Sequence, residues 1–215
     1  AVGAEMVADV EPYERMKLRM LNGSHSTLAY LGYLAGYQTV SQTMADPAYE
    51  QMVRQLMTEE VMPTLDMPGT DLAAYRDALI ARFHNPALKH RTWQIAMDGS
   101  QKLPQRFLGT VRDRLAAGQS IDRLALGIAG WMRYVTGTDE TGAAIDVRDP
   151  LAARLKALGD EAGRDPERLT RVYLGVDEVF GRDLRETPAF VDAVTQALAL
   201  LFEKGAAATV RVYSG

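Results

Sequence analysis

The stretch Tyr13–Gly36 reads YERMKLRMLNGSHSTLAYLGYLAG. It contains no proline and is rich in leucine and methionine, which favours a long helix. Asp9, Glu11 and Pro12 precede or overlap its start, and a proline in the first turn beside acidic residues is typical of a helix N-terminus. Gly23 marks either a break in this helix or a place where another group approaches its backbone closely.

The rest of the chain repeats the pattern of helices that begin at an Asp or Thr followed by proline. Helices are expected at about residues 46–62, 70–85, 104–117, 121–135, 150–159, 166–174 and 188–204. The segment 87–106 is irregular and dense in polar groups, and a short strand is expected at either end of the chain, at 5–10 and 209–213. The sequence therefore predicts an all-α fold in which residues 1–215 form one domain.

Composition and charge narrow the class of protein. With 215 residues, 47% hydrophobic and 24% charged, the chain has the makeup of a globular domain with one sizeable core. Its net charge of -4 argues against a nucleic-acid-binding protein, which needs a basic surface. The absence of cysteine excludes disulfides, thiolate catalysis and Cys-ligated zinc. No apolar run reaches the roughly 18 residues of a membrane span, so we expect a cytoplasmic protein that binds no membrane.

Three polar residues of the expected central helix face one side. On an ideal α-helix, Asn22 lies about 140° and His25 about 80° from Lys17, all within about 12 Å along the axis. An amine, an amide and an imidazole are thereby placed where one small ligand contacts all three. Lys17 would transfer a proton, while Asn22 and His25 would hydrogen-bond a substrate oxygen.

The apolar neighbours of Lys17 bear on its chemistry. By the same arithmetic, Leu21, Leu28 and Leu31 lie within about 40° of Lys17, so its amine is expected to be partly desolvated. Desolvation lowers the pKa of a lysine toward neutrality, which suits general acid/base catalysis. Two simpler interpretations stay open, because a lysine beside an apolar stripe commonly extends to water and a single histidine is commonly a core residue.

The sequence offers no common site for a nucleotide or a metal ion. It has no Gly-x-Gly-x-x-Gly after a strand and no loop that ends in Gly-Lys-Ser/Thr. His84 and His90 are separated by six positions and by Pro86, a spacing too irregular for a two-histidine metal site. We therefore expect neither a bound metal nor a complete dinucleotide site in this chain.

The motif Lys-x4-Asn-x2-His, formed by Lys17, Asn22 and His25, resembles the active-site motif of the long-chain polyol dehydrogenases, the mannitol dehydrogenase family. Residues 85–106, NPALKHRTWQIAMDGSQKLPQR, are similar to the segment that closes the substrate pocket in that family. The resemblance implies that this chain is the helical C-terminal domain. An N-terminal Rossmann domain, absent from this chain, would bind NAD or NADP.

The resemblance also implies roles for individual residues. Lys17 would be the general acid/base of a dehydrogenase that needs no zinc, and Asn22 would stabilise the developing alkoxide. His25 would bind and orient substrate oxygens. Lys102 matches a substrate-binding lysine of the family, although a solvated surface lysine is an equal alternative.

The expected substrate is an open-chain six-carbon sugar acid or sugar alcohol. Some polyol-specific members carry an arginine eight residues before the position of Lys102, where this sequence has Gln94, which argues against a direct transfer of mannitol specificity. Arg91, next to His90, would bind a carboxylate through two hydrogen bonds or belong to a structural ion network, and the second interpretation is favoured.

The block DGSQKLPQR most resembles the fructuronate reductase (mannonate oxidoreductase) branch of the family. A mannitol 2-dehydrogenase acting on fructose and mannitol is the second expectation, and a tagaturonate or altronate enzyme is the third. A helical interaction module without catalytic activity is the alternative from another class. It would explain the helical content but not the polar side chains on one face.

Overall fold

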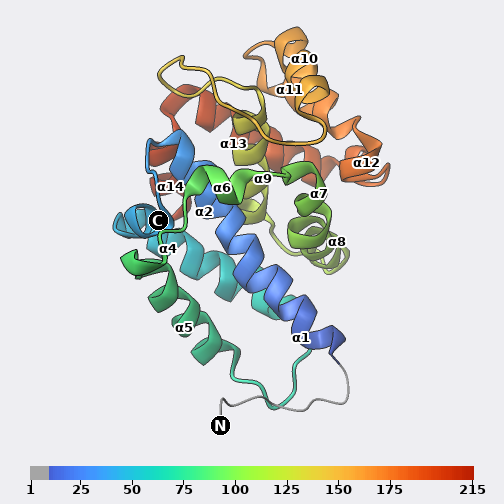
Figure 1. Cartoon of the computed structure of the whole chain (residues 1–215). Helices are drawn as coiled ribbons and strands as arrows, with labels where there is room; N and C mark the ends of the chain where they lie inside the picture. Colours follow the sequence, from blue (N-terminus) through green and yellow to red (C-terminus); the bar gives the residue numbers. More distant parts are fainter. Residues whose placement is uncertain (1–9) are drawn as a thin grey trace.

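The computed structural model describes residues 10–215, which fold into packed helices, as the all-α prediction requires (Figure 1). The expected central helix is continuous and consists of α1 (Glu11–Met16), the π-helical turn η1 (Lys17–Asn22) and α2 (Gly23–Leu34). The other elements are α3 (Val40–Met44), α4 (Pro47–Gln55), η2 (Leu56–Val61), η3 (Met62–Thr64), α5 (Leu72–His84), η4 (Pro86–Leu88), α6 (Thr92–Ala96), α7 (Gly99–Leu103), η5 (Pro104–Leu108), α8 (Gly109–Ala116), α9 (Asp122–Val135), α10 (Ala152–Ala162), α11 (Pro166–Leu174), α12 (Asp177–Phe180), η6 (Leu184–Glu186), α13 (Pro188–Lys204) and α14 (Ala206–Tyr213).

Aspartates begin several of these helices, as the sequence predicts. The side chain of Asp46 accepts a hydrogen bond from the first turn of α4, Asp71 does the same for α5, and Asp165 for α11. Such caps satisfy backbone N–H groups that have no partner inside the helix. The segment 87–106 is less irregular than expected, because it contains the short helices α6 and α7.

The strand expected at 209–213 is wrong, since these residues belong to α14. Thr209 and Val210 favour a strand by composition, but both are buried as α14 packs against α2, α4 and α13. Only isolated β-bridges occur in residues 10–215, so a strand at 209–213 would have no partner for its backbone groups. The other expected strand, at 5–10, lies outside the described residues except for Val10.

The central helix forms the middle of the core. It crosses the molecule diagonally in Figure 1, with α6 in front of it. α2 packs against α9, which in turn packs against α13. Leu28 and Leu31 from α2 and Trp131 from α9 are fully buried. No helix in the described part of the chain combines the length and apolarity needed to cross a bilayer.

A buried carboxylate caps the N-terminus of α9. Glu60, on η2, is 1% exposed and accepts hydrogen bonds from the backbone N–H groups of Arg123 (2.8 Å) and Leu124 (2.9 Å). The N-cap residue Ile121 provides no side-chain acceptor, so Glu60 replaces it from a distant element. Burial raises the pKa of Glu60, and the two N–H groups oppose this shift by stabilising the carboxylate.

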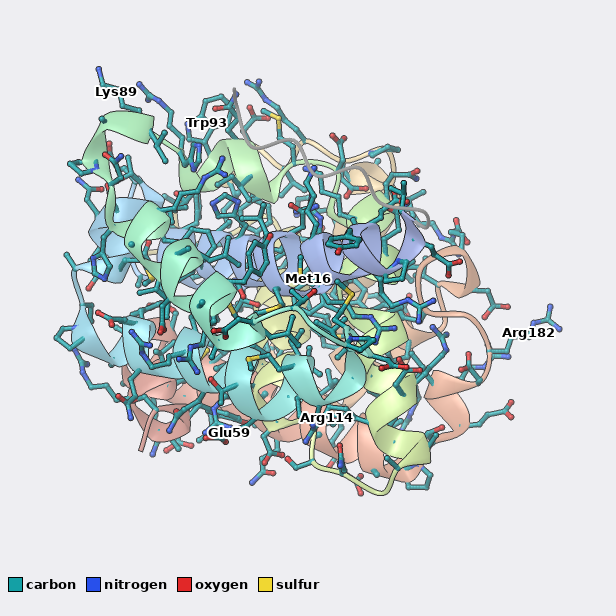
Figure 2. The ribbon with its side chains drawn as sticks, turned by 90° about the horizontal axis from the view of Figure 1, so that it is seen from below. Met16, Glu59, Lys89, Trp93, Arg114 and Arg182 are labelled. Atoms are coloured by element: carbon teal, nitrogen blue, oxygen red, sulfur yellow. The ribbon has the colours of Figure 1, made fainter. Side chains whose placement is uncertain are left out.

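Arg114 also links η2 to the residues just before α9, but it does so as a hydrogen-bond donor. Its side chain is buried and donates hydrogen bonds to the backbone carbonyls of Glu59 (2.7 Å) and Ser120 (2.5 Å). In Figure 2, Glu59 and Arg114 lie on the opposite side of the central helix from Lys89 and Trp93. These structural polar groups are therefore remote from the face that α6 covers.

We expect Glu60→Ala to lower the free energy of unfolding by about 2–4 kcal/mol, because two buried N–H groups lose their acceptor and α9 loses its cap. Denaturant unfolding followed by circular dichroism measures the change. Glu60→Gln keeps an acceptor oxygen and is the control, with less than half of the loss expected. Equal losses in the two variants would contradict the capping role.

Candidate functional site

The central helix changes its hydrogen-bonding pattern at the candidate catalytic residues. In η1 the backbone N–H of Gly23 donates to the carbonyl of Leu18, five residues earlier. A π turn contains about one residue more than an α turn, so each later residue is rotated by about 100° from its position on an uninterrupted α-helix. The angles predicted above are therefore wrong beyond this turn.

The π turn brings Asn22 and His25 closer to Lys17 around the helix axis. Removing one residue step of about 100° places Asn22 about 40° and His25 about 20° from Lys17. The exposure of the side chains agrees with this arrangement. Lys17 is exposed, Asn22 is partly exposed, and His25 is the one residue in 23–32 that is not buried. The three polar groups line up where the helix reaches the surface.

The expectation that Lys17 lies among apolar side chains is wrong. Leu28 and Leu31 are fully buried, whereas Lys17 is exposed and only Leu21 is partly buried near it. The same rotation explains the error, because it turns Leu28 to about 80° and Leu31 to about 140° from Lys17. Any desolvation of the Lys17 amine would thus need atoms from outside residues 10–215.

His25 is held as a neutral imidazole. Its ring centroid lies 4.7 Å from that of Phe83 and 5.1 Å from that of His90. Burial, together with the nearby charges of His90, Arg106 and Arg82, lowers the pKa of His25 from 6.5 to about 3. Its Nε2 is buried and has no hydrogen-bond partner in residues 10–215. Near neutral pH, the His25 imidazole can therefore form a hydrogen bond with a ligand, but it carries no extra proton to transfer to one.

Lys102 lies on α7 with its amine partly buried. Its Nζ donates hydrogen bonds to the carbonyls of Ile95 (3.3 Å) and Met97 (2.5 Å) at the end of α6. Burial lowers the pKa of Lys102, and the charge of Arg106 adds to the effect. An ammonium group has three donors, so one N–H of Lys102 is left for a ligand.

Gln94 and Arg91 lie on and just before α6, and both are exposed. Arg91 forms a β-bridge with Thr39 and borders a depression of about 440 Å³ beside Tyr33 and Trp93. Tyr33 follows Asn22 by 11 residues, or about 17 Å of helix, so this depression is remote from Lys17. Arg91 forms no ion pair within residues 10–215, so the favoured ion network is not observed. Its role in binding a carboxylate stays a prediction.

Arg106 is a residue of this site that the sequence analysis missed. It lies on η5, which packs against η1. Its Nη1 donates hydrogen bonds to Ser26 Oγ (2.8 Å) and to the carbonyl of Asn22 (3.4 Å). Arg106 was visible within the DGSQKLPQR block, but no spacing in the sequence indicates that it meets a residue 84 positions earlier.

The candidate groups are the amine, amide and neutral imidazole on the central helix and a second, partly buried amine on α7. They are suited to bind the oxygens of a polyhydroxylated ligand and to transfer a proton. Within residues 10–215, no group of three or more His, Asp or Glu side chains is placed to hold a metal ion.

Residues 9–202 match the family model of the mannitol dehydrogenase C-terminal domain. The chain belongs to this family. The resemblance found in its sequence is thereby confirmed, and so is the all-helical character expected of this domain.

Relatives of known name share this domain. The D-mannonate oxidoreductase of Escherichia coli K12 is 56% identical, over 95% of this chain and 42% of its own length. Mannitol dehydrogenase 2 of Saccharomyces cerevisiae is 38% identical, over 98% of this chain and 41% of its own length. The mannitol 2-dehydrogenase of Pseudomonas fluorescens, solved in a ternary complex with NAD and D-mannitol, has a TM-score of 0.91 at 36% identity and covers 98% of this chain. The chain spans 42% of that structure.

We expect His25 to remain uncharged between about pH 5 and pH 8, because its pKa is well below the ordinary value of about 6.5. Since the unfolded chain binds a proton on His25 below pH 6.5 and the folded chain does not, His25 increasingly favours unfolding as the pH falls from 6.5 toward 3. NMR titration of the imidazole signals measures this. The chain has three histidines, so His84 and His90 give reference signals and His25→Gln assigns the third. A midpoint for His25 above about 5 would contradict the buried neutral state.

Proposed function

We propose that this chain is the substrate-side domain of an NAD- or NADP-dependent secondary-alcohol dehydrogenase that acts on open-chain sugar acids or sugar alcohols. The observation that carries the proposal is the alignment of Lys17, Asn22 and His25 along the exposed side of the central helix. Interconversion of fructuronate and mannonate is the favoured reaction. The identity of 56% with a D-mannonate oxidoreductase supports this choice.

The remainder of the enzyme is proposed to be an N-terminal Rossmann domain that binds the nicotinamide cofactor. Three observations support it. The chain spans 42% of the relative's length, its sequence lacks a dinucleotide-binding glycine loop, and the side-chain amine of Lys17 has no hydrogen bond or ion pair within residues 10–215. Such a domain would cover the exposed side of the central helix and desolvate the Lys17 amine. The bound cofactor would supply or accept the hydride.

The residues of this chain would handle the oxygen atoms and the proton. During reduction of a ketone, Lys17 would donate its proton to the new alkoxide, and in the reverse direction it would accept the proton of the hydroxyl. The amide N–H of Asn22 would donate to the same oxygen and stabilise its developing charge. Neutral His25 would hydrogen-bond a neighbouring hydroxyl. Lys102 and Gln94 would bind oxygens farther along the substrate.

We expect Lys17→Ala in the full-length protein to lower kcat by at least about 100-fold, the scale of general acid/base catalysis. Affinity for the cofactor should change little, since Lys17 acts on the substrate oxygen. Steady-state kinetics and cofactor titration measure the two effects. Lys204→Ala, which removes an exposed lysine from the end of α13, is the matched control. Full activity in Lys17→Ala would end the assignment.

A mannitol 2-dehydrogenase is the second candidate, favoured by the TM-score of 0.91 to such an enzyme. A substrate panel separates the two. We expect the full-length protein to reduce fructuronate with a kcat/KM at least about tenfold above that for fructose, because a site that binds the substrate carboxylate rejects the neutral analogue. Tagaturonate, which carries the same carboxylate, is included in the panel as the third expected substrate. Both cofactors should be assayed with each ketone. A preference for fructose would select the second candidate.

A further inference from the structure

The two π turns η1 and η5 meet backbone against backbone. A Cβ atom added to Gly23 would lie 3.0 Å from the backbone oxygen of Arg106, closer than side chains normally pack. The helix runs through Gly23 without a break, so the close approach anticipated there is the correct one of the two sequence interpretations. Because residue 23 has no side chain, η5 can approach the turn that carries Lys17 and Asn22.

The guanidinium of Arg106 completes this contact. It donates to Ser26 Oγ at 2.8 Å and to the carbonyl of Asn22 at 3.4 Å, and Ser26 is fully buried. Arg106 has no carboxylate within ion-pair distance in the described part of the chain. Arg106 is partly buried, and even partial withdrawal of a cation from water without a counter-charge is unfavourable. A residue kept there at such a cost is expected to have a task that an apolar side chain would not perform.

Two side chains donate to backbone carbonyls where η1 passes into α2. The hydrogen-bonding pattern changes at Asn22 and Gly23 from five-residue to four-residue spacing, where a helical ladder is easily disturbed. Arg106 donates to the carbonyl of Asn22, and Thr27 Oγ1 donates to that of Gly23 at 3.1 Å. The hydrogen bond from Arg106 therefore acts on Asn22, the residue whose side chain is proposed to stabilise the alkoxide.

We propose that Arg106 is a positioning residue. By binding the Asn22 carbonyl and the Ser26 hydroxyl, it holds the π turn in the orientation that directs the Asn22 amide and the Lys17 amine to one substrate oxygen. This inference rests on the proposed function. It adds a residue that touches neither the substrate nor the cofactor.

The test compares variants of the full-length enzyme with the substrate on which it is most active. We expect Arg106→Ala to lower kcat by about tenfold or more, since a misplacement of about 1 Å costs up to 100-fold. The KM values for substrate and cofactor should change less than kcat. Arg106→Lys retains a donor and should keep more of the activity. Millimolar guanidinium added to Arg106→Ala should restore part of the lost kcat, which a general loss of folding would not allow.

Two further variants keep the test decisive. Ser26→Ala removes one acceptor of Arg106 with little change in volume, and a lowered kcat with an unchanged Tm would support the proposal even if Arg106→Ala fails to fold. Arg112→Ala is the matched control, because Arg112 lies on the adjoining helix α8 and contacts Asp183 and the carbonyl of Phe180 instead. It should leave kcat unchanged.

The possible results separate this inference from the proposed function. An unchanged kcat in folded Arg106→Ala and Ser26→Ala, or a rise in substrate KM alone, would overturn the positioning role. If Lys17→Ala abolishes turnover while these variants remain active, only the inference about Arg106 fails. If Lys17→Ala is fully active, the proposed function itself fails.

Discussion

The extra residue in the turn Lys17–Asn22 is the constraint on which the core and the candidate site both depend. Almost every residue of α2 is buried, so Leu28 and Leu31 fix the rotation of that half of the helix against α9. Met16, directly before the turn, and Met20, inside it, are buried and fix the other half in the same way. A helix with uniform α geometry would turn one of these halves away from the core, because about 100° separates the two settings. The π turn lets both halves bury their apolar residues.

The polar groups of the domain fall into two sets with different surroundings. The buried Glu60 carboxylate has two backbone N–H partners, and Arg114 has backbone carbonyls, so their hydrogen-bonding capacity is largely used within the fold. The side-chain amine of Lys17 and the Nε2 atom of His25 have no such partners within residues 10–215. Groups of the first kind stabilise the structure, whereas groups of the second kind gain interactions only when another molecule or another part of the protein reaches them.

The sequence predicted those features that depend on local chemistry. Aspartate caps and first-turn prolines located α4, α5 and α11, and the proline-free stretch located the central helix. The π turn was not predictable, because angles read from a sequence assume one helical period throughout. The strand predicted at 209–213 was wrong because β-branched residues favour strands by composition, whereas this segment forms a helix that packs against α13 and α2. Arg106 was missed because its partners come from a different part of the chain.

The placement of the π turn has a consequence for how this domain can vary among its relatives. Loops at the surface absorb added or lost residues, since neither end of a loop must keep a fixed rotation. The segment between Met16 and Leu28 has no such freedom, because losing one residue would rotate α2 by about 100° and turn part of its buried side away from the core. We therefore expect relatives to differ along this helix by replacement of side chains and not by gain or loss of residues.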